Sequence, residues 1–500
     1  MDMAKRTSPR VLLLVIGLVI AALVAAGIGW YVTRPSDLAS FYSQQPKWSD
    51  CEGGKCTTVK VPTDYENPDN GTVTLQVKVF PATGKGGKRL FINPGGPGAS
   101  VIGGFDDYMA EALGKEVREI YDVVAVDPRG VGSSEPLDCL SDKDLYALYA
   151  DDQTPDDQGE ARKFDKDWTE FGSKCRAESG GLAAHMTTEE TARDFDVVRD
   201  ALKAKTFDWF GYSYGARLGA TYATLFPDKV GRMVLDGAED PSLEFVEAFL
   251  IQSKGFEVAL RSYVEDCVQQ PTCPLGSDTD AGIRKVVSVL ESLDAEPLKT
   301  SDADRPLTQG MAEWGLGYPL YAKASWPDLT KALAAAFKGD GTPLRTLGDD
   351  YLYYLPEDGT FADNGMEAFP LISCLDAEGR VTAEEAPVHV ERFAKESPVF
   401  GKGMAWSLAW CAGIPESDHP QIDIDAQGSA PIVVMGTTRD PATPYEQSIA
   451  LAKQLGSAVF VTREGDGHTA YDMGNGCIDK LVDTYLARGT VPKDKTVCKE

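Results

Sequence analysis

Short apolar runs alternate with amphipathic segments along the chain and predict strands and helices in turn. The runs expected to be strands are 72–80, 89–92, 121–126, 206–210, 230–235, 431–435 and 458–462. The segments expected to be helices are 187–202, 216–225, 445–455 and 478–487. Thr187 and Glu190 form the pattern of a capping box at the start of the first helix. This alternation predicts an α/β fold, with a mostly parallel sheet flanked by helices on both faces.

The strand pattern stops between residues 241 and 425 and then returns. A chain of 500 residues is too long for one simple core, and an interruption of about 185 residues is too long for a loop. We therefore expect a mainly helical lid at 241–425, inserted between the strand at 230–235 and the strand at 431–435. The core is expected to comprise 34–240 and 426–500, with the lid above its site.

A serine pentapeptide lies between one predicted strand and the helix that follows it. Gly211-Tyr212-Ser213-Tyr214-Gly215 has the pattern Gly-x-Ser-x-Gly. On a tight strand-to-helix turn, such a serine points its hydroxyl out of the sheet, and the glycines allow close backbone approach. The context predicts a nucleophile elbow with Ser213 as nucleophile. An acidic nucleophile, as in epoxide or haloalkane hydrolases, is absent from this position.

The expected partners of Ser213 follow later strands. Asp440 comes just after the strand at 431–435, and His468 lies in a glycine-rich loop after the strand at 458–462. Serine needs a base, and a carboxylate orients the imidazole that serves as one. The order Ser213, Asp440, His468 is that of an α/β-hydrolase triad. Asp236, which also ends a strand, is the alternative acid.

An oxyanion hole requires two backbone N–H groups near the serine. One is expected from Tyr214, the residue after the nucleophile. The other is expected from the loop Asn93-Pro94-Gly95-Gly96-Pro97-Gly98, with Gly96 preferred and Gly95 as the alternative. Arg129, in a loop after another strand, is expected to have a structural role.

Composition and charge narrow the function classes. The net charge of −28 opposes binding to nucleic acid and can attract cationic ligands, or it can simply keep the protein soluble. The chain has only four histidines and no Cys-x-x-Cys motif, so no metal is expected. We also expect no flavin or nucleotide cofactor, because the glycine-rich loops lack a phosphate-binding pattern.

The N-terminus and the cysteines indicate export. A basic segment, 1–10, is expected to stay in the cytoplasm and precedes an apolar segment, 11–33, which fits a transmembrane anchor or a cleaved signal peptide. All ten cysteines lie beyond it, which favours disulfides in an extracellular protein or one anchored to the outer face of the plasma membrane. The simplest pairing joins neighbours: Cys51–Cys56, Cys139–Cys175, Cys267–Cys273, Cys374–Cys411 and Cys477–Cys498.

The motifs together resemble the exported bacterial tripeptidyl aminopeptidases, a branch of the proline iminopeptidase family within the α/β-hydrolases. The shared motifs include the Asn93–Gly98 loop, Asp127-x-Arg129-Gly130, the elbow, Val234-Leu235-Asp236-Gly237, Asp440-Pro441-x-Thr443-Pro444 and Gly467-His468. The likeness runs from about residue 38 to the C-terminus. It implies a serine exopeptidase that releases short peptides or single residues from free N-termini, without a cofactor.

Such an enzyme must bind a charged amine, and a buried ammonium needs carboxylate partners. Glu239, Asp240 and Glu244 follow the strand at 230–235, where the lid begins, and are candidates. An esterase or lipase with the same triad is the main alternative. A non-catalytic binding protein is the alternative of another class. The sequence leaves the length of the released peptide and the oligomeric state open.

Overall fold

The structure is a computed structural model that describes residues 38–417 and 422–499. The predicted segments 1–10 and 11–33 lie outside the described residues. No helix within the described ranges combines the length and the apolar character needed to cross a bilayer.

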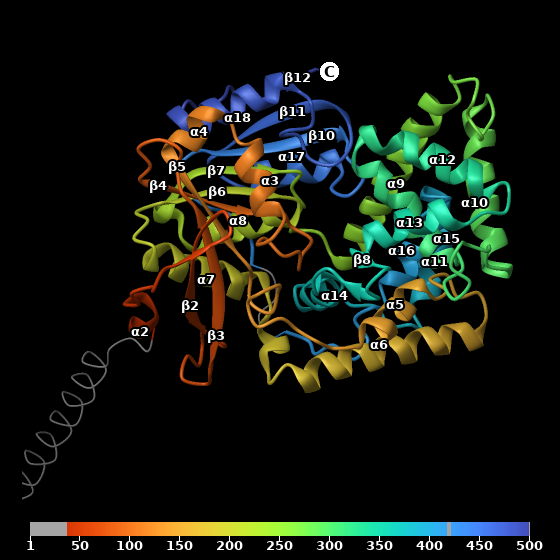
Figure 1. Cartoon of the computed structure of the whole chain (residues 1–500), viewed down its shortest axis with the longest axis horizontal. Coiled ribbons are helices and arrows are strands. Elements are labelled where there is room, and N and C mark those ends of the chain that lie inside the picture. The colour runs from red at the N-terminus through yellow and green to blue at the C-terminus, as the bar shows by residue number, and fades with distance from the viewer. Residues whose placement is uncertain (1–37, 418–421, 500) are drawn as a thin grey trace, which may run out of the picture.

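A ten-stranded sheet forms the centre of the core and is mostly parallel (Figure 1). Its strands are β1 (Ser49–Cys51), β2 (Gly54–Pro62), β3 (Thr72–Phe80), β4 (Lys88–Asn93), β5 (Tyr121–Val126), β6 (Phe207–Tyr212), β7 (Val230–Asp236), β10 (Ile432–Arg439), β11 (Ala458–Asp466) and β12 (Thr496–Cys498). The spatial order is β1-β2-β3-β5-β4-β6-β7-β10-β11-β12. The pairings from β1 to β5 are antiparallel, and those from β5 to β12 are parallel.

The register of the central strands brings several chain segments to one edge of the sheet. Tyr212 at the end of β6 pairs with Asp236 at the end of β7, and Asp236 pairs with Met435 in β10. Arg439 pairs with Asp466 at the end of β11. The residues that follow these strands, including Ser213 and the segments around 440 and 468, therefore start from neighbouring positions.

Helices cover both faces of the sheet, as the alternation of strands and helices predicts. The core helices are α2 (Ala39–Tyr42), α3 (Phe105–Ala112), α4 (Lys115–Ile120), α7 (Thr188–Ala201), α8 (Tyr214–Leu225), α17 (Tyr445–Gln454) and α18 (Gly476–Arg488). Successive strand residues point to opposite faces. Phe91 of β4 packs in the apolar cluster that contains α7 and α8, whereas Ile92 packs in the cluster that contains α3 and α18.

The elements between β7 and β10 are almost all helical and form the lid, seen at the right of Figure 1. They are α9 (Phe245–Cys267), α10 (Thr279–Ala295), α11 (Gln309–Gly317), η3 (Tyr318–Tyr321), η4 (Lys323–Ser325), α12 (Trp326–Ala336), α13 (Thr342–Tyr351), β8 (Tyr354–Leu355), β9 (Thr360–Phe361), α14 (Gly365–Leu375), α15 (Ala386–Glu396) and α16 (Gly401–Ser407). The fold class predicted from the sequence is confirmed. The limits 241–425 stay a prediction.

Two helices from the first part of the chain extend the lid, which the sequence analysis did not foresee. They are α5 (Asp142–Ala150) and α6 (Gln158–Glu178), and Figure 1 shows them beneath the lid helices. Trp168 of α6 stacks on Trp410 with ring centroids 5.0 Å apart, and Phe164 lies 5.5 Å from Trp406. Aromatic burial of this kind joins the two chain segments into one lobe.

Five disulfides connect the ten cysteines. They are Cys51–Cys56, Cys139–Cys175, Cys267–Cys273, Cys374–Cys411 and Cys477–Cys498. The pairing matches the neighbour pairing expected from the sequence. Disulfides of this number are typical of a protein that folds in an oxidising compartment.

Candidate active site

Ser213 occupies the turn between β6 and α8 in a backbone conformation that few residues adopt. Its φ is 54° and its ψ is −125°, which places a non-glycine residue at positive φ. The Ser213 N–H donates to the carbonyl of Asp236, at 2.8 Å. A Cβ on Gly211 would collide with the carbonyl of Gly215. The turn therefore needs a glycine at 211, as a nucleophile elbow does.

His468 lies against Asp440, which the sequence analysis preferred as its partner. The imidazole Nδ1–H donates to Asp440, with Nδ1 2.8 Å from Oδ1 and 3.0 Å from Oδ2. Asp440 also accepts the N–H groups of Ala442, Thr443 and Thr469, at 3.0, 2.9 and 3.0 Å. These bonds fix the carboxylate, and the bond at Nδ1 leaves Nε2 as the basic nitrogen.

Asp236, the alternative acid, has another task. Its Oδ2 accepts the N–H groups of Ala470 and Tyr471, at 3.1 and 2.9 Å, and so holds the loop that follows His468. Complete burial raises the pKa of this carboxyl to about 7. The alternative is therefore not supported, because Asp440 and not Asp236 is bonded to the imidazole.

The electrostatic surroundings of His468 favour its charged form. Burial alone would lower the pKa of the imidazole, but the charge and the hydrogen bond of Asp440, together with other nearby carboxylates, raise the pKa above its usual value. Asp236 and Glu239 act in the same direction. A triad histidine must become a cation during catalysis, and these carboxylates stabilise that cation.

The loop after β4 lies directly against the elbow. Gly95 has a φ of 101°, and a Cβ on it would lie 3.0 Å from both the Ser213 Cβ and the Tyr214 nitrogen. The Gly95 N–H donates to Asn93 Oδ1 at 2.9 Å, which leaves Gly96 as the glycine for an oxyanion. Gly96 and Tyr214 line the same cavity as Ser213. Within the described chain, neither of their N–H groups has a bonded acceptor.

A cavity of about 500 Å³ lies between the core and the lid. Ser213, Gly96 and His468 line its core side. Its lid side is rich in aromatic residues: Phe245, Phe249, Phe256, Trp314, Tyr318, Tyr321, Tyr351, Tyr353, Phe369, Phe400 and Trp410. Ser213 and His468 therefore face a cavity whose other wall is formed by the lid.

Tyr321 of the lid is a residue at the site that the sequence analysis missed. The backbone carbonyl of Tyr321 accepts the backbone N–H of His468 at 2.8 Å. The Tyr321 ring stands edge-on to the imidazole, with ring centroids 5.3 Å apart. The lid therefore helps to position the histidine. No local sequence motif predicts this contact, because Tyr321 and His468 are far apart in sequence.

The three acids predicted to bind an amine are placed differently. Glu239 and Asp240 line the cavity, whereas Glu244 is exposed just before α9 and does not line it. Asp240 accepts bonds from Ser242 and Gln454. The structure thus brings only Glu239 and Asp240 to the site.

Glu239 belongs to a buried charge network that the sequence analysis also missed. Arg217, one helical turn after Ser213, lies 3.5 Å from Glu239 and 3.3 Å from Asp376. Burial raises the pKa of Glu239, although Arg217 opposes this shift. One cation stands between two carboxylates, so the network keeps an excess of negative charge beside the elbow.

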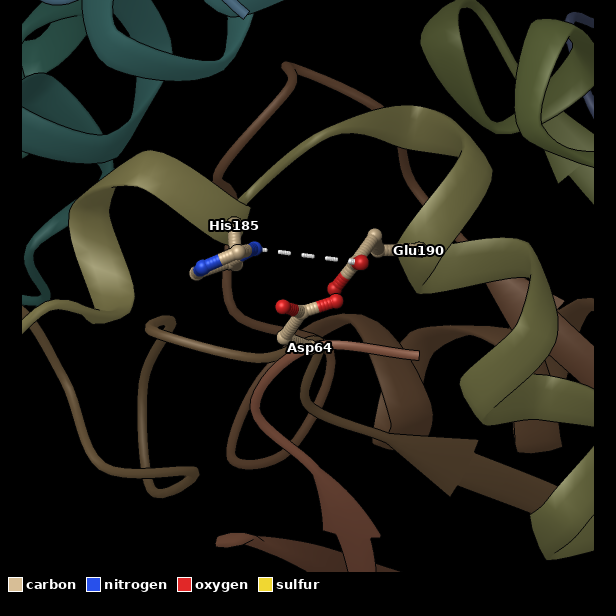
Figure 2. Close-up of side chains that lie close together, drawn as sticks. All are labelled: Asp64, His185 and Glu190. Atoms are coloured by element: carbon tan, nitrogen blue, oxygen red, sulfur yellow. Dashed lines mark ion pairs between the residues drawn. The ribbon is translucent and has the colours of Figure 1, made fainter. Parts of the chain in front are cut away.

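A cluster elsewhere has the composition of a metal site. Ligand atoms of Asp64, His185 and Glu190 lie within 4.8 Å of one another (Figure 2). The Glu190 side chain is bonded to the guanidinium of Arg129, so it does not complete the expected capping box. Arg129 also binds Asp194, at 2.6 and 2.8 Å, as its expected structural role requires. A metal ion would face this guanidinium, and we assign the cluster no catalytic part.

Comparison with known proteins places the chain in a family. Residues 397–498 match the family described as TAP-like protein, and residues 88–329 match the family described as alpha/beta hydrolase fold. The serine protease Hip1 of Mycobacterium tuberculosis is 34% identical over 98% of both chains.

Two further relatives carry other names. Carboxylesterase B of Mycobacterium tuberculosis is 33% identical over 92% of this chain and 91% of that protein. The tripeptidyl aminopeptidase of Streptomyces lividans is 30% identical over 90% of this chain and 86% of that protein. The chain therefore belongs, with these relatives, to the TAP-like family of serine hydrolases with the α/β-hydrolase fold.

Proposed function

We propose that this protein is a serine exopeptidase that releases short peptides, three residues in the simplest case, from free N-termini. The observation that carries the proposal is that Ser213 and His468 line one cavity together with the carboxylates of Glu239 and Asp240. Relatives named serine protease and tripeptidyl aminopeptidase support a peptide substrate.

The geometry supports an acyl-enzyme mechanism. Ser213 Oγ attacks the scissile carbonyl, while Nε2 of His468 takes its proton. Asp440 stabilises the resulting imidazolium, and the N–H groups of Tyr214 and Gly96 bind the oxyanion. His468 then gives the proton to the leaving amine. Water, activated by the same imidazole, hydrolyses the ester formed on Ser213.

An exopeptidase must also recognise the end of its substrate. The acyl part of the substrate occupies the part of the cavity that Glu239 and Asp240 line, and these acids can attract an ammonium. A bound ammonium would offset the excess negative charge of the Arg217 network. We therefore propose Glu239 as the amine-binding acid nearest the elbow, with Asp240 beside it, and no longer assign this role to Glu244.

The same protein is proposed to act outside the cytoplasm. Its disulfides fit an oxidising compartment. The N-terminal apolar segment 11–33 would direct its export, as an anchor in the plasma membrane or as a cleaved signal peptide.

A carboxylesterase activity is the second candidate. The aromatic lining of the cavity would accept an apolar acyl group, and one relative is named carboxylesterase B. The two candidates differ in their need for a charged amine, because an ester of a fatty acid offers none.

One experiment separates them. Residues 36–500 are assayed on a tripeptidyl aminomethylcoumarin with a free N-terminus, on its N-acetylated counterpart and on p-nitrophenyl butyrate. The peptidase predicts that acetylation lowers kcat/KM at least tenfold, about 1.4 kcal/mol in transition-state binding. Equal rates on both peptides, or hydrolysis of the ester alone, would overturn the proposal.

A further inference from the structure

Glu313 is a cavity carboxylate that neither the sequence motifs nor the triad accounts for. It lies on α11 and lines the lid side of the cavity, with Gln153, Trp314 and Trp410. Among the residues that the structure describes, none forms a hydrogen bond or an ion pair with its side chain. The Glu239 carboxylate at the other side of the cavity differs, because Arg217 already neutralises part of its charge.

A glycine beside Glu313 leaves room for its carboxylate at the cavity wall. Gly403 of α16 also lines the cavity, and a Cβ on it would collide with Oε2 of Glu313. Burial raises the pKa of the Glu313 carboxyl to about 8, with Asp152 adding to the shift and the exposed Lys402 opposing it. A cation bound beside this carboxyl would favour its ionised form and so lower its pKa again. The position therefore suits a positively charged group of a ligand.

The route from the triad to this carboxylate crosses the aromatic wall of the lid. Ring centroids are separated by 5.3 Å from His468 to Tyr321, 5.8 Å from Tyr321 to Tyr351 and 4.9 Å from Tyr351 to Trp314, the neighbour of Glu313. Glu313 and Ser213 thus line the same cavity from different parts of the molecule, Glu313 from the lid and Ser213 from the core.

We propose that Glu313 is a specificity-determining residue that binds a cationic group of the peptide substrate at the lid end of the cavity. The cation is the charged end of a basic side chain or, in place of the Glu239 contact proposed above, the N-terminal ammonium of the peptide. Trp314 and Trp410 beside it suit either source, because indole faces attract ammonium and guanidinium ions. This inference rests on the proposed peptidase function and adds the part of the cavity that selects the substrate.

The test uses the isosteric substitution Glu313→Gln, with Glu391→Gln as a matched control. Glu391 is an exposed lid carboxylate on α15, outside the cavity. Substrates are tripeptidyl aminomethylcoumarins: Ala-Ala-Ala, its N-acetylated form, and N-acetylated forms with lysine or norleucine at the first position. Gly403→Ala is a second variant, which displaces the Glu313 carboxylate without removing it.

The two possible sources of the cation predict different losses of kcat/KM in the Glu313→Gln variant. If the ammonium binds, Glu313→Gln lowers kcat/KM at least tenfold on free Ala-Ala-Ala and less than twofold on its acetylated form. If a basic side chain binds, the variant removes a lysine-over-norleucine preference of at least tenfold. In both cases Gly403→Ala gives a smaller loss in the same direction, and Glu391→Gln gives none.

Other outcomes contradict the inference. Losses below twofold on every substrate, in a Glu313→Gln protein with unchanged melting temperature, would overturn it. An equal loss on all substrates would also overturn it, because it would indicate a structural role. Failure of the proposed function looks different: the wild-type protein would then hydrolyse none of these peptides while still cleaving the ester.

Discussion

The core and the lid differ in how each holds the residues that face the cavity. In the core, the Ser213 N–H donates to the carbonyl at the end of β7, and the Asp440 carboxylate accepts backbone N–H groups of Thr443 and Thr469. In the lid, the cavity wall consists of aromatic rings, and Glu313 has no bonded partner in the described chain. Under the proposed function, the core carries the chemistry and the lid selects what reaches it. Tyr321 is the point where the two meet.

Removal of the proposed nucleophile should have the largest effect of any test of the separate roles of core and lid. Ser213→Ala should lower kcat by about four orders of magnitude or more, because only binding and oxyanion contacts remain. Substrate affinity should change little, since the lid surfaces are intact. A fluorophosphonate probe, mapped by mass spectrometry, should label the wild type at Ser213. Labelling at Ser100, Ser133 or Ser134 instead would move the site.

The two buried aspartates of the core provide a matched pair. Asp440→Asn should lower kcat by about 10⁴, since it disturbs the tautomer and cation of His468. Asp236→Asn should cost less than about tenfold, because Asp236 holds the following loop and acts on His468 only through its charge, without a hydrogen bond to the imidazole. Circular dichroism and melting temperatures check that both variants fold. A larger loss for Asp236→Asn would refute the assigned acid.

The pH profile tests the electrostatics of the core alone. The raised pKa of His468 means that the imidazole gains its proton at a higher pH than an ordinary histidine. Catalysis needs the neutral base, so kcat/KM should fall as pH drops through a midpoint above about 6.5. The N-acetylated substrate serves here, because its own amine does not titrate. A midpoint below 6.5 would contradict the arrangement.

Disulfide removal should have the smallest effect on the chemistry and still distinguish the two regions. In the chain-entropy model, Cys374–Cys411 of the lid and Cys477–Cys498 of the core each contribute about 3–4 kcal/mol. Replacing either pair by serine should lower the melting temperature. Only the lid variant should also weaken the preference for a free amine. If both variants kept the same preference for a free amine, the lid disulfide would contribute to stability and not to substrate selection, contrary to this prediction.

The sequence predicted the core far better than the lid. Strands such as 121–126 are continuous apolar runs, and the elbow, Asp440 and His468 follow such strands, so local pattern located them. The strand β2 was missed, although its buried Val59 and Val61 alternate with exposed Thr58 and Lys60.

The lid depends on contacts between distant segments, which leave no local pattern. The stack of Trp168 on Trp410 joins α6 to the end of the lid across more than two hundred residues. Likewise, the sequence alone does not distinguish Glu313 from the many acidic residues of the surface, because only the structure places it in the cavity. The candidate catalytic residues were therefore predictable from motifs, and the lid residues that line the cavity were not.

The most direct test of the central claim is product analysis on a ten-residue peptide with a free N-terminus. Mass spectrometry of early time points should find N-terminal fragments, chiefly tripeptides, and the matching shortened peptide. The N-acetylated peptide should remain intact over the same interval. Internal fragments, or equal cleavage of the acetylated peptide, would contradict an enzyme whose lid admits only the free end of a chain.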